Sequence, residues 1–312
     1  MATTETVLRR SIEERGGQLF LTLDPAFQGL PDTAHGGSVL AAFDTLAGLS
    51  GPRAVAGVYR KRVPLATPLA LVLQRADSTC TFVLSEGDTI LVHGRVEPSA
   101  PGAGGGGAAG PFRDPWLLGV AGRPVHETSA AGSDASVVAE GARRPTPAGT
   151  PLPISRTCFA CGTDNPLGLR LQLEFDDAEV RGTWRPHEPF RAADGALATA
   201  ALTTLADEAA FWLGALATGE SGMTTDLRVT LHRAVPFGGA ITVTGARASA
   251  RPQADRRYWD TEVVVRADDG AAIASASITF VAVRGAARRL VNGMLAINPP
   301  AVVGRVFPAY AR

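Results

Sequence analysis

Residues 35–49 read HGGSVLAAFDTLAGL, and residues 195–216 read GALATAALTTLADEAAFWLGAL. In both stretches apolar residues recur at helical spacing, and nearly every face of the resulting helix is apolar. A helix that is apolar almost all round is buried inside a protein. The sequence therefore predicts two long buried helices, one in each half of the chain.

Strand-like segments surround both helices in the same order. The pairs Glu86-Gly87 and Asp269-Gly270 occupy matching hairpin turns, where a residue with positive φ is favoured. The repeated order predicts an α+β fold in which a curved antiparallel sheet wraps one central helix, twice over. The expected strands are residues 16–25, 55–65, 69–77 and 80–97 in the first half, and 169–175, 179–186, 224–237, 240–250, 258–270 and 272–283 in the second.

Composition divides the chain into four parts. Residues 98–155 contain PSAPGAGGGGAAGP and GARRPTPAGTPLP, a density of glycine and proline that supports neither helix nor strand. Within this linker, residues 112–120 are apolar and could pack back onto a domain. We expect a first domain at 1–97, the linker at 98–155, a second domain at 156–284 and a C-terminal tail at 285–312.

Charge and cysteine content exclude several classes of protein. The 312 residues carry 30 positive and 30 negative side chains, so nothing attracts a polyanion and nucleic acid is not an expected partner. The 45% of apolar residues is enough for real cores. Three cysteines are too few for a disulfide framework, and no signal peptide or membrane-spanning stretch is apparent. We therefore expect a cytoplasmic protein without a membrane partner.

Three motifs carry a resemblance to a known family. His35-Gly36-Gly37, followed by six residues and Asp44, resembles the HGG helix of PaaI-like acyl-CoA thioesterases of the hotdog superfamily. Residues 158–169, CFACGTDNPLGL, resemble the CFxCGxxNPxGL opening of many members, and residues 224–229 resemble the strand after the helix. The resemblance covers most of both halves. It implies a double hotdog fold that pairs internally as a pseudo-dimer, with sites at the interface of the pair; further homo-oligomerisation stays open.

The start of the first helix suits thioester chemistry. The first N–H groups of a helix lack internal partners and carry partial positive charge, and Gly36 and Gly37 let a ligand approach them closely. Such donors suit the oxyanion of a thioester carbonyl. Asp44 lies about two turns further on roughly the same face, as a general base or a nucleophile. His35 would position the loop or the substrate. The alternative is a glycine-rich helix start with Asp44 hydrogen-bonded inside the fold.

The second helix departs from the motif. Aligning Asp207 with Asp44 places Ala198, Thr199 and Ala200 where HGG would stand, while the acid is doubled as Asp207-Glu208. This second site is expected to be inactive, purely structural or changed in its chemistry.

The resemblance also implies an opposing wall for the first helix. Because sites in that family lie across the interface, Thr224, Thr225 and Asp226 are the candidates for substrate binding. Cys158 and Cys161 offer two zinc ligands but no second pair, so we predict a structural motif and no metal site.

These features predict an enzyme that hydrolyses an acyl thioester of coenzyme A or of an acyl carrier protein. No cofactor is expected beyond coenzyme A as part of the substrate. Two alternatives stay open. One is a repurposed hotdog enzyme, such as a dehydratase, hydratase, isomerase or cyclase. The other is a non-catalytic acyl-binding protein.

Overall fold

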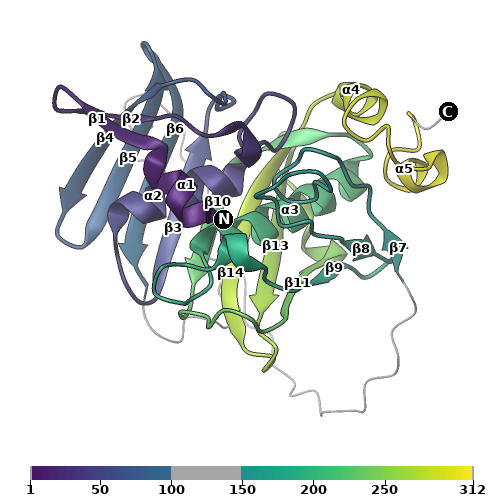
Figure 1. Ribbon diagram of the computed structural model, residues 1–312. Helices are drawn as coiled ribbons and strands as arrows, with labels where there is room; N and C mark the ends of the chain where they lie inside the picture. Colours follow the sequence, from purple (N-terminus) through teal and green to yellow (C-terminus); the bar gives the residue numbers. More distant parts are fainter. Residues whose placement is uncertain (1, 100–148, 311–312) are drawn as a thin grey trace, which may run out of the picture. The chain divides into compact units, whose positions relative to one another are not determined.

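The computed structural model describes residues 2–99 and 149–310. Most of the expected linker, including the apolar stretch at 112–120, lies outside these residues. The described chain is α+β, with 14 antiparallel strands in one sheet (Figure 1). In the part of the chain that is described, no helix is long and apolar enough to cross a membrane.

Both predicted central helices are present. They are α2 (Gly36–Ala47) and α3 (Thr199–Thr218), and both are largely buried. Each helix ends at a glycine in the left-handed conformation, Gly48 with φ 64° and Gly219 with φ 65°. The starts of the helices differ: the Gly37 nitrogen of α2 lies 3.2 Å from His35 Nδ1, whereas Ala198 gives α3 no side-chain cap.

The sheet consists of two sets of strands joined edge to edge. Its order is β1-β2-β4-β5-β6-β3 from the first half, then β10-β14-β13-β11-β9-β8-β7 from the second, with β12 paired to β13. The joining strands β3 and β10 run antiparallel, in a register from Val58 opposite Asp226 to Arg53 opposite Leu231. The first set is β1 (Ile12–Arg15), β2 (Gln18–Leu21), β3 (Arg53–Tyr59), β4 (Leu69–Ala76), β5 (Thr79–Glu86) and β6 (Thr89–Pro98). The second is β7 (Thr150–Pro151), β8 (Glu174–Phe175), β9 (Glu179–Trp184), β10 (Gly222–Leu231), β11 (Ile241–Ala246), β12 (Arg251–Pro252), β13 (Tyr258–Arg266) and β14 (Ala272–Ala282).

Each helix packs on its own set of strands through an aromatic residue over a glycine. In the first half, the Phe43 ring of α2 stacks on Phe82 at 4.7 Å. A Cβ on Gly94 of β6 would lie only 2.4 Å from that ring. In the second half, Phe280 of β14 packs on Gly214 of α3, where a Cβ would again lie 2.4 Å from the ring. These positions need glycine for close approach of helix and sheet.

Two segments differ from, or add to, the expected elements. Of the strand expected at 169–175 only β8 forms, because the N–H groups of Leu169 and Leu171 donate instead to the carbonyls of Phe159 and Ala160. The chain beyond residue 285 contains two short helices whose apolar side chains are buried. The remaining helices are α1 (Thr4–Arg10), α4 (Ala286–Asn292) and α5 (Pro300–Val306), with short 3-10 turns at Pro25–Phe27, Glu188–Phe190 and Arg247–Ser249.

Candidate functional site

The two central helices cross in close contact near the start of α2. A Cβ on Gly37 would lie 2.6 Å from the carbonyl group of Thr203 and 2.7 Å from the Cα of Thr204. The Thr203 hydroxyl donates a hydrogen bond of 2.7 Å to the Gly37 carbonyl. The second glycine of the motif thus makes room for the backbone of α3.

Beside this crossing lies a buried charged cluster, which we call the α2 site: His35, Gly36, Gly37, Asp207, Glu208 and Thr224. Its centre is the Asp207 carboxylate. One oxygen, Oδ2, accepts the Gly37 N–H at 3.0 Å and lies 3.1 Å from His35 Nδ1. The other oxygen, Oδ1, accepts the Thr224 hydroxyl at 2.7 Å. A Cβ on Gly36 would lie 2.7 Å from Oδ2, so the first glycine makes room for this carboxylate.

The neighbours of Asp207 keep the pair ionised in spite of burial. Burial alone would lower the pKa of His35, but the charge and hydrogen bond of Asp207, together with Glu208, raise that pKa well above its usual value. Burial would raise the pKa of Asp207, but His35, Thr224 and the Gly37 N–H outweigh it and hold that pKa below its usual value. The α2 site therefore holds a buried carboxylate beside a buried imidazolium.

One side of the α2 site is open to solvent. His35, Asp207 and Glu208 are buried, whereas Gly36, Tyr59 and Thr224 are each partly exposed. The Tyr59 hydroxyl donates to the Gly36 carbonyl at 2.7 Å. Burial, together with Asp207 and Asp226, raises the pKa of Tyr59 well above its usual value, so its hydroxyl keeps its proton.

The wall expected from β10 is only partly assembled at the site. Thr224 binds Asp207, but the Thr225 hydroxyl donates instead to the Thr279 carbonyl of β14. Asp226 lies two residues beyond Thr224 and is partly buried. Its burial and the nearby Asp260 raise its pKa from 3.8 to about 6.

Glu208 completes the inner side of the cluster. Its Oε1 accepts the indole N–H of Trp212 at 2.9 Å, and its Oε2 lies 3.4 Å from His35 Nε2. Cys158 lies beside these two groups, and a hydrogen bond with Cys161 lowers the pKa of its thiol.

The CFACGTDNPLGL segment packs against the loop that leads into α2. Phe159 lies with its ring centroid 5.0 Å from that of Phe27 and 6.4 Å from that of His35. The Asn165 side chain donates to the carbonyls of Ala26 and Thr157, at 2.7 and 2.9 Å. The motif therefore connects the second half of the chain to the loop that carries His35.

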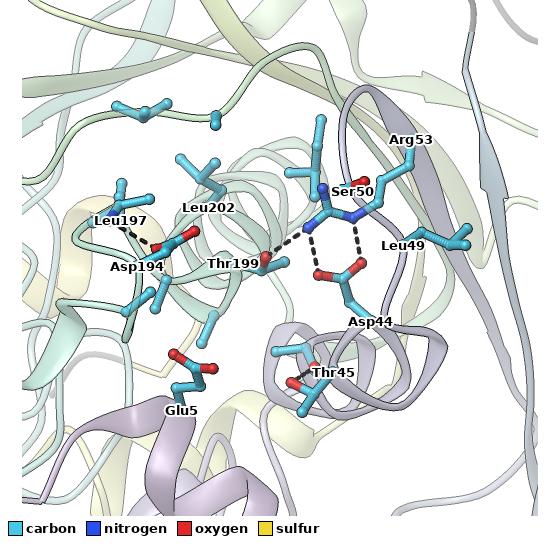
Figure 2. A pocket seen from close by; sticks show the side chains of 18 of the residues that line it. Glu5, Asp44, Thr45, Leu49, Ser50, Arg53, Asp194, Leu197, Thr199 and Leu202 are labelled. Atoms are coloured by element: carbon cyan, nitrogen blue, oxygen red, sulfur yellow. Dashed lines mark hydrogen bonds and ion pairs between the residues drawn. The ribbon is translucent and has the colours of Figure 1, made fainter.

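Asp44 lies elsewhere, at a second crossing that we call the α3 site: Asp44, Thr45, Arg53 and residues 198–200. Both Asp44 oxygens accept from the Arg53 guanidinium, Oδ1 at 2.5 Å and Oδ2 at 2.7 Å. The same guanidinium donates to the Thr199 hydroxyl at 3.1 Å (Figure 2). These groups line a cavity of about 500 Å³, bordered further by side chains such as Glu5 and Arg233.

The structure thus brings the expected residues together in groups that their spacing along the sequence does not predict. His35, Gly36 and Gly37 meet the second-helix candidates Asp207 and Glu208 and the wall residue Thr224. Asp44 is seven residues from Gly37, or about 10.5 Å along the helix axis. One small reacting group cannot contact both. Sequence analysis did not single out Tyr59, Trp212 or Arg53, which carry no motif of their own and reach the two sites only through folding.

No protein-family model matches the chain, and no curated protein matches it significantly in sequence. Solved structures do match. A conserved protein of unknown function with a hotdog fold from Alicyclobacillus acidocaldarius is 14% identical, with a TM-score of 0.53 over 90% of this chain and 97% of that one. The tesB protein of Mycobacterium avium subs paratuberculosis is 12% identical, with a TM-score of 0.54 over 90% and 98%. An acyl-CoA thioesterase II from Mycobacterium marinum is 10% identical, with a TM-score of 0.53 over 90% and 98%. The chain therefore has the hotdog fold.

Proposed function

We propose that the chain is a double hotdog enzyme that hydrolyses acyl thioesters at the α2 site. The observation that carries this proposal is the position of the Asp207 carboxylate, held by the Gly37 N–H and the Thr224 hydroxyl at the start of α2. The thioesterases among the solved structures of the same fold support the reaction class. The pairing of β3 with β10 supports an internal pseudo-dimer.

Asp207 is the proposed general base. A carboxylate offers about four lone-pair positions, and the contacts from Gly37, His35 and Thr224 use three of them. The remaining position can accept a hydrogen bond from water. Asp207 takes a proton from this water as the oxygen attacks the thioester carbonyl. The C–S bond then breaks and the leaving thiolate takes the proton back from Asp207, which releases a carboxylic acid and the thiol of the carrier.

The start of α2 supplies the hydrogen-bond donor proposed for the oxyanion. The N–H of Gly36 is the first of the helix and has no partner within it. It lies at the positive end of the helix dipole, and Gly36 and the nearby Thr224 are partly exposed. It is the proposed donor to the oxyanion. His35 keeps Asp207 ionised and in place, which makes it a positioning residue.

The proposed substrate is the thioester of coenzyme A or of an acyl carrier protein. Coenzyme A enters only as part of the substrate, and no separate cofactor takes part in the hydrolysis. All three cysteines are free thiols, which supports a reducing, cytoplasmic setting.

The test compares the two aligned acids. Free-thiol release is measured on a panel of short, medium, branched and aromatic acyl-CoAs with wild type, Asp207→Asn and Asp44→Asn. We expect kcat to fall about 10²- to 10⁴-fold in Asp207→Asn, the range of general-base catalysis, and to change by less than about tenfold in Asp44→Asn. The reverse order would move the reaction to the α3 site. Folded wild type with no turnover on any substrate would reject thioester hydrolysis.

One observation favours a second candidate, hydration of an enoyl thioester. Hydratases of this superfamily pair an acid with a histidine at the reacting carbons, and here His35 Nδ1 lies 3.1 Å from Asp207 Oδ2. Loss of the enoyl absorbance without thiol release, abolished in His35→Gln, would establish this reaction instead.

A further inference from the structure

The Cys158 thiol and the Glu208 carboxylate on the inner side of the α2 site have no part in the proposed hydrolysis, and the Nε2 atom of His35 faces this side. Cys158 Sγ, a ring nitrogen of His35 and a Glu208 oxygen all lie within 4.8 Å of one another, and all three residues are buried. They come from three separate segments: the loop before α2, the CFACG segment and the middle of α3. Such a combination of sulfur, nitrogen and oxygen ligands is typical of zinc.

We propose that Cys158, His35 and Glu208 bind a zinc ion. A tetrahedral zinc with these ligands needs ligand-to-ligand distances of about 3.4 to 3.6 Å. The distance from His35 Nε2 to Glu208 Oε2 is already 3.4 Å. The sulfur has to move inward by at most about 1.2 Å to complete the triangle.

The distance between His35 and Glu208 is long for a hydrogen bond and also fits two ligands of one metal ion. A hydrogen bond between an imidazolium and a carboxylate is normally about 2.7 to 2.9 Å long. At 3.4 Å the two atoms are too far apart for a strong bond of this kind, although both groups are buried. Two ligands of one ion, in contrast, are held apart at this distance.

The groups behind the ligands are those that a zinc site requires. Metal-bound histidines usually donate their other N–H to a carboxylate, and His35 Nδ1 faces Asp207 Oδ2 at 3.1 Å. The second oxygen of Glu208 is held by the Trp212 indole at 2.9 Å. Cys158 Sγ accepts the N–H of Ala160 at 3.3 Å. Each ligand is therefore oriented by a partner outside the triangle.

Charge balance favours the ion as well. One thiolate, one carboxylate and a neutral imidazole offset the two positive charges of zinc, so the buried unit is neutral. Asp207 keeps its contact with His35 Nδ1–H in this state and stays available as a base.

The test uses the full chain, purified with a tag that contains no histidine, and zinc measured by elemental mass spectrometry and by competition with a chromophoric chelator. We expect one zinc per chain in wild type. Cys158→Ser and Glu208→Gln should weaken zinc binding by more than about 100-fold, beyond the effect of losing an outer partner. Cys80→Ser, the same change at a buried cysteine outside the cluster, should bind zinc like wild type.

Two further measurements fix the ligand set. Trp212→Phe and Cys161→Ser remove groups outside the triangle and should cost about tenfold to 100-fold in affinity. Cobalt added to metal-free wild type should give a thiolate-to-cobalt charge-transfer band, which needs no variant to fold. Absence of that band, zinc binding weaker than micromolar in wild type, or unchanged binding in Cys158→Ser would overturn the proposal. Because these readouts do not use turnover, they are independent of the proposed hydrolysis.

Discussion

The α2 site and the α3 site are built by the same two helices, yet their contents are opposite. In each site the start of one helix meets an acid from the middle of the other: Asp207 at the start of α2, and Asp44 near the start of α3. The α2 site is filled by a buried charged cluster. The α3 site contains a cavity of about 500 Å³ and an arginine that occupies both oxygens of its acid.

The difference comes down to a few side chains. Gly36 and Gly37 let α3 and its acid approach the start of α2, whereas the aligned positions at the start of α3 are Thr199 and Ala200. Thr199, with its hydroxyl, turns towards Arg53 instead. The comparison teaches that the acid alone does not make a site of this kind; what matters is whether the facing helix start can come within hydrogen-bond distance of it.

The largest expected effect comes from removing the ion pair of the α3 site. Arg53→Ala leaves the buried Asp44 without its partner, so the free energy of unfolding should fall by about 3 kcal/mol. Urea unfolding followed by circular dichroism measures the loss. The double variant Asp44→Ala/Arg53→Ala should recover at least about 1 kcal/mol, because no charge is then left unpaired. Equal losses in the single and double variants would show that Arg53 acts through packing alone.

The next prediction exchanges glycine and alanine between the starts of α2 and α3. In Gly37→Ala the new Cβ would meet the α3 backbone at 2.6 Å, which should destabilise the fold by about 2 to 3 kcal/mol. The aligned change in the other direction, Ala200→Gly, should cost only about 1 kcal/mol, the helix propensity of glycine. Thermal melts of both variants give the ranking. A Gly37→Ala protein as stable as wild type would contradict the close crossing.

A third prediction concerns an acid on the joining strand β10. Beside the α2 site β10 carries Asp226, opposite Val58 of β3. The pKa of Asp226 rises from 3.8 to about 6 on folding, so the folded state binds the proton more tightly. Stability contributed by this group therefore falls as the pH rises from about 4 to 6 and stays low above that. Asp226→Asn should raise the free energy of unfolding at pH 7 by roughly 1 to 3 kcal/mol, with little gain at pH 4.

The smallest effect is the pH dependence that only the α2 site has. The folded-state pKa of His35 is raised, mainly by Asp207 against the effect of burial. Its contribution to stability is complete below pH 6.5 and is lost as the pH rises through the raised value. In metal-free protein, the melting temperature of wild type should therefore fall more steeply at alkaline pH than that of His35→Gln. If the melting temperatures of the two proteins changed with pH in parallel, the charged form of His35 would not contribute to stability.

The sequence predicts the elements of this fold well, because their signals are local. Both buried helices and both hairpins, at Gly87 and Gly270, lie where periodicity and turn residues indicate. The strand expected at 169–175 is mostly absent, because the N–H groups of Leu169 and Leu171 donate to the CFACG segment, a pairing that periodicity does not indicate.

The sequence indicates individual residues of the candidate site, but not which of them lie together in the fold. Its glycines, its histidine and both second-helix acids were found from one motif and one internal alignment. Spacing along one helix favoured Asp44, since Asp44 and Gly37 share a face. Only the packing of α3 against α2 brings Asp207 to the Gly37 N–H. Likewise the sequence predicts a structural motif at Cys158 and Cys161, because His35 and Glu208, the other ligands of the proposed zinc site, are distant from Cys158 in sequence.

The continuity of the sheet through β3 and β10 has a consequence for evolution. Were the two halves separate copies of one chain, related by a two-fold axis, any substitution would appear in both sites at once. A single covalent chain lifts that restriction, so one site can lose its glycines while the other keeps them. Selection can then act on each site alone, keeping the shared helix crossing as scaffold and giving one chain two unequal pockets.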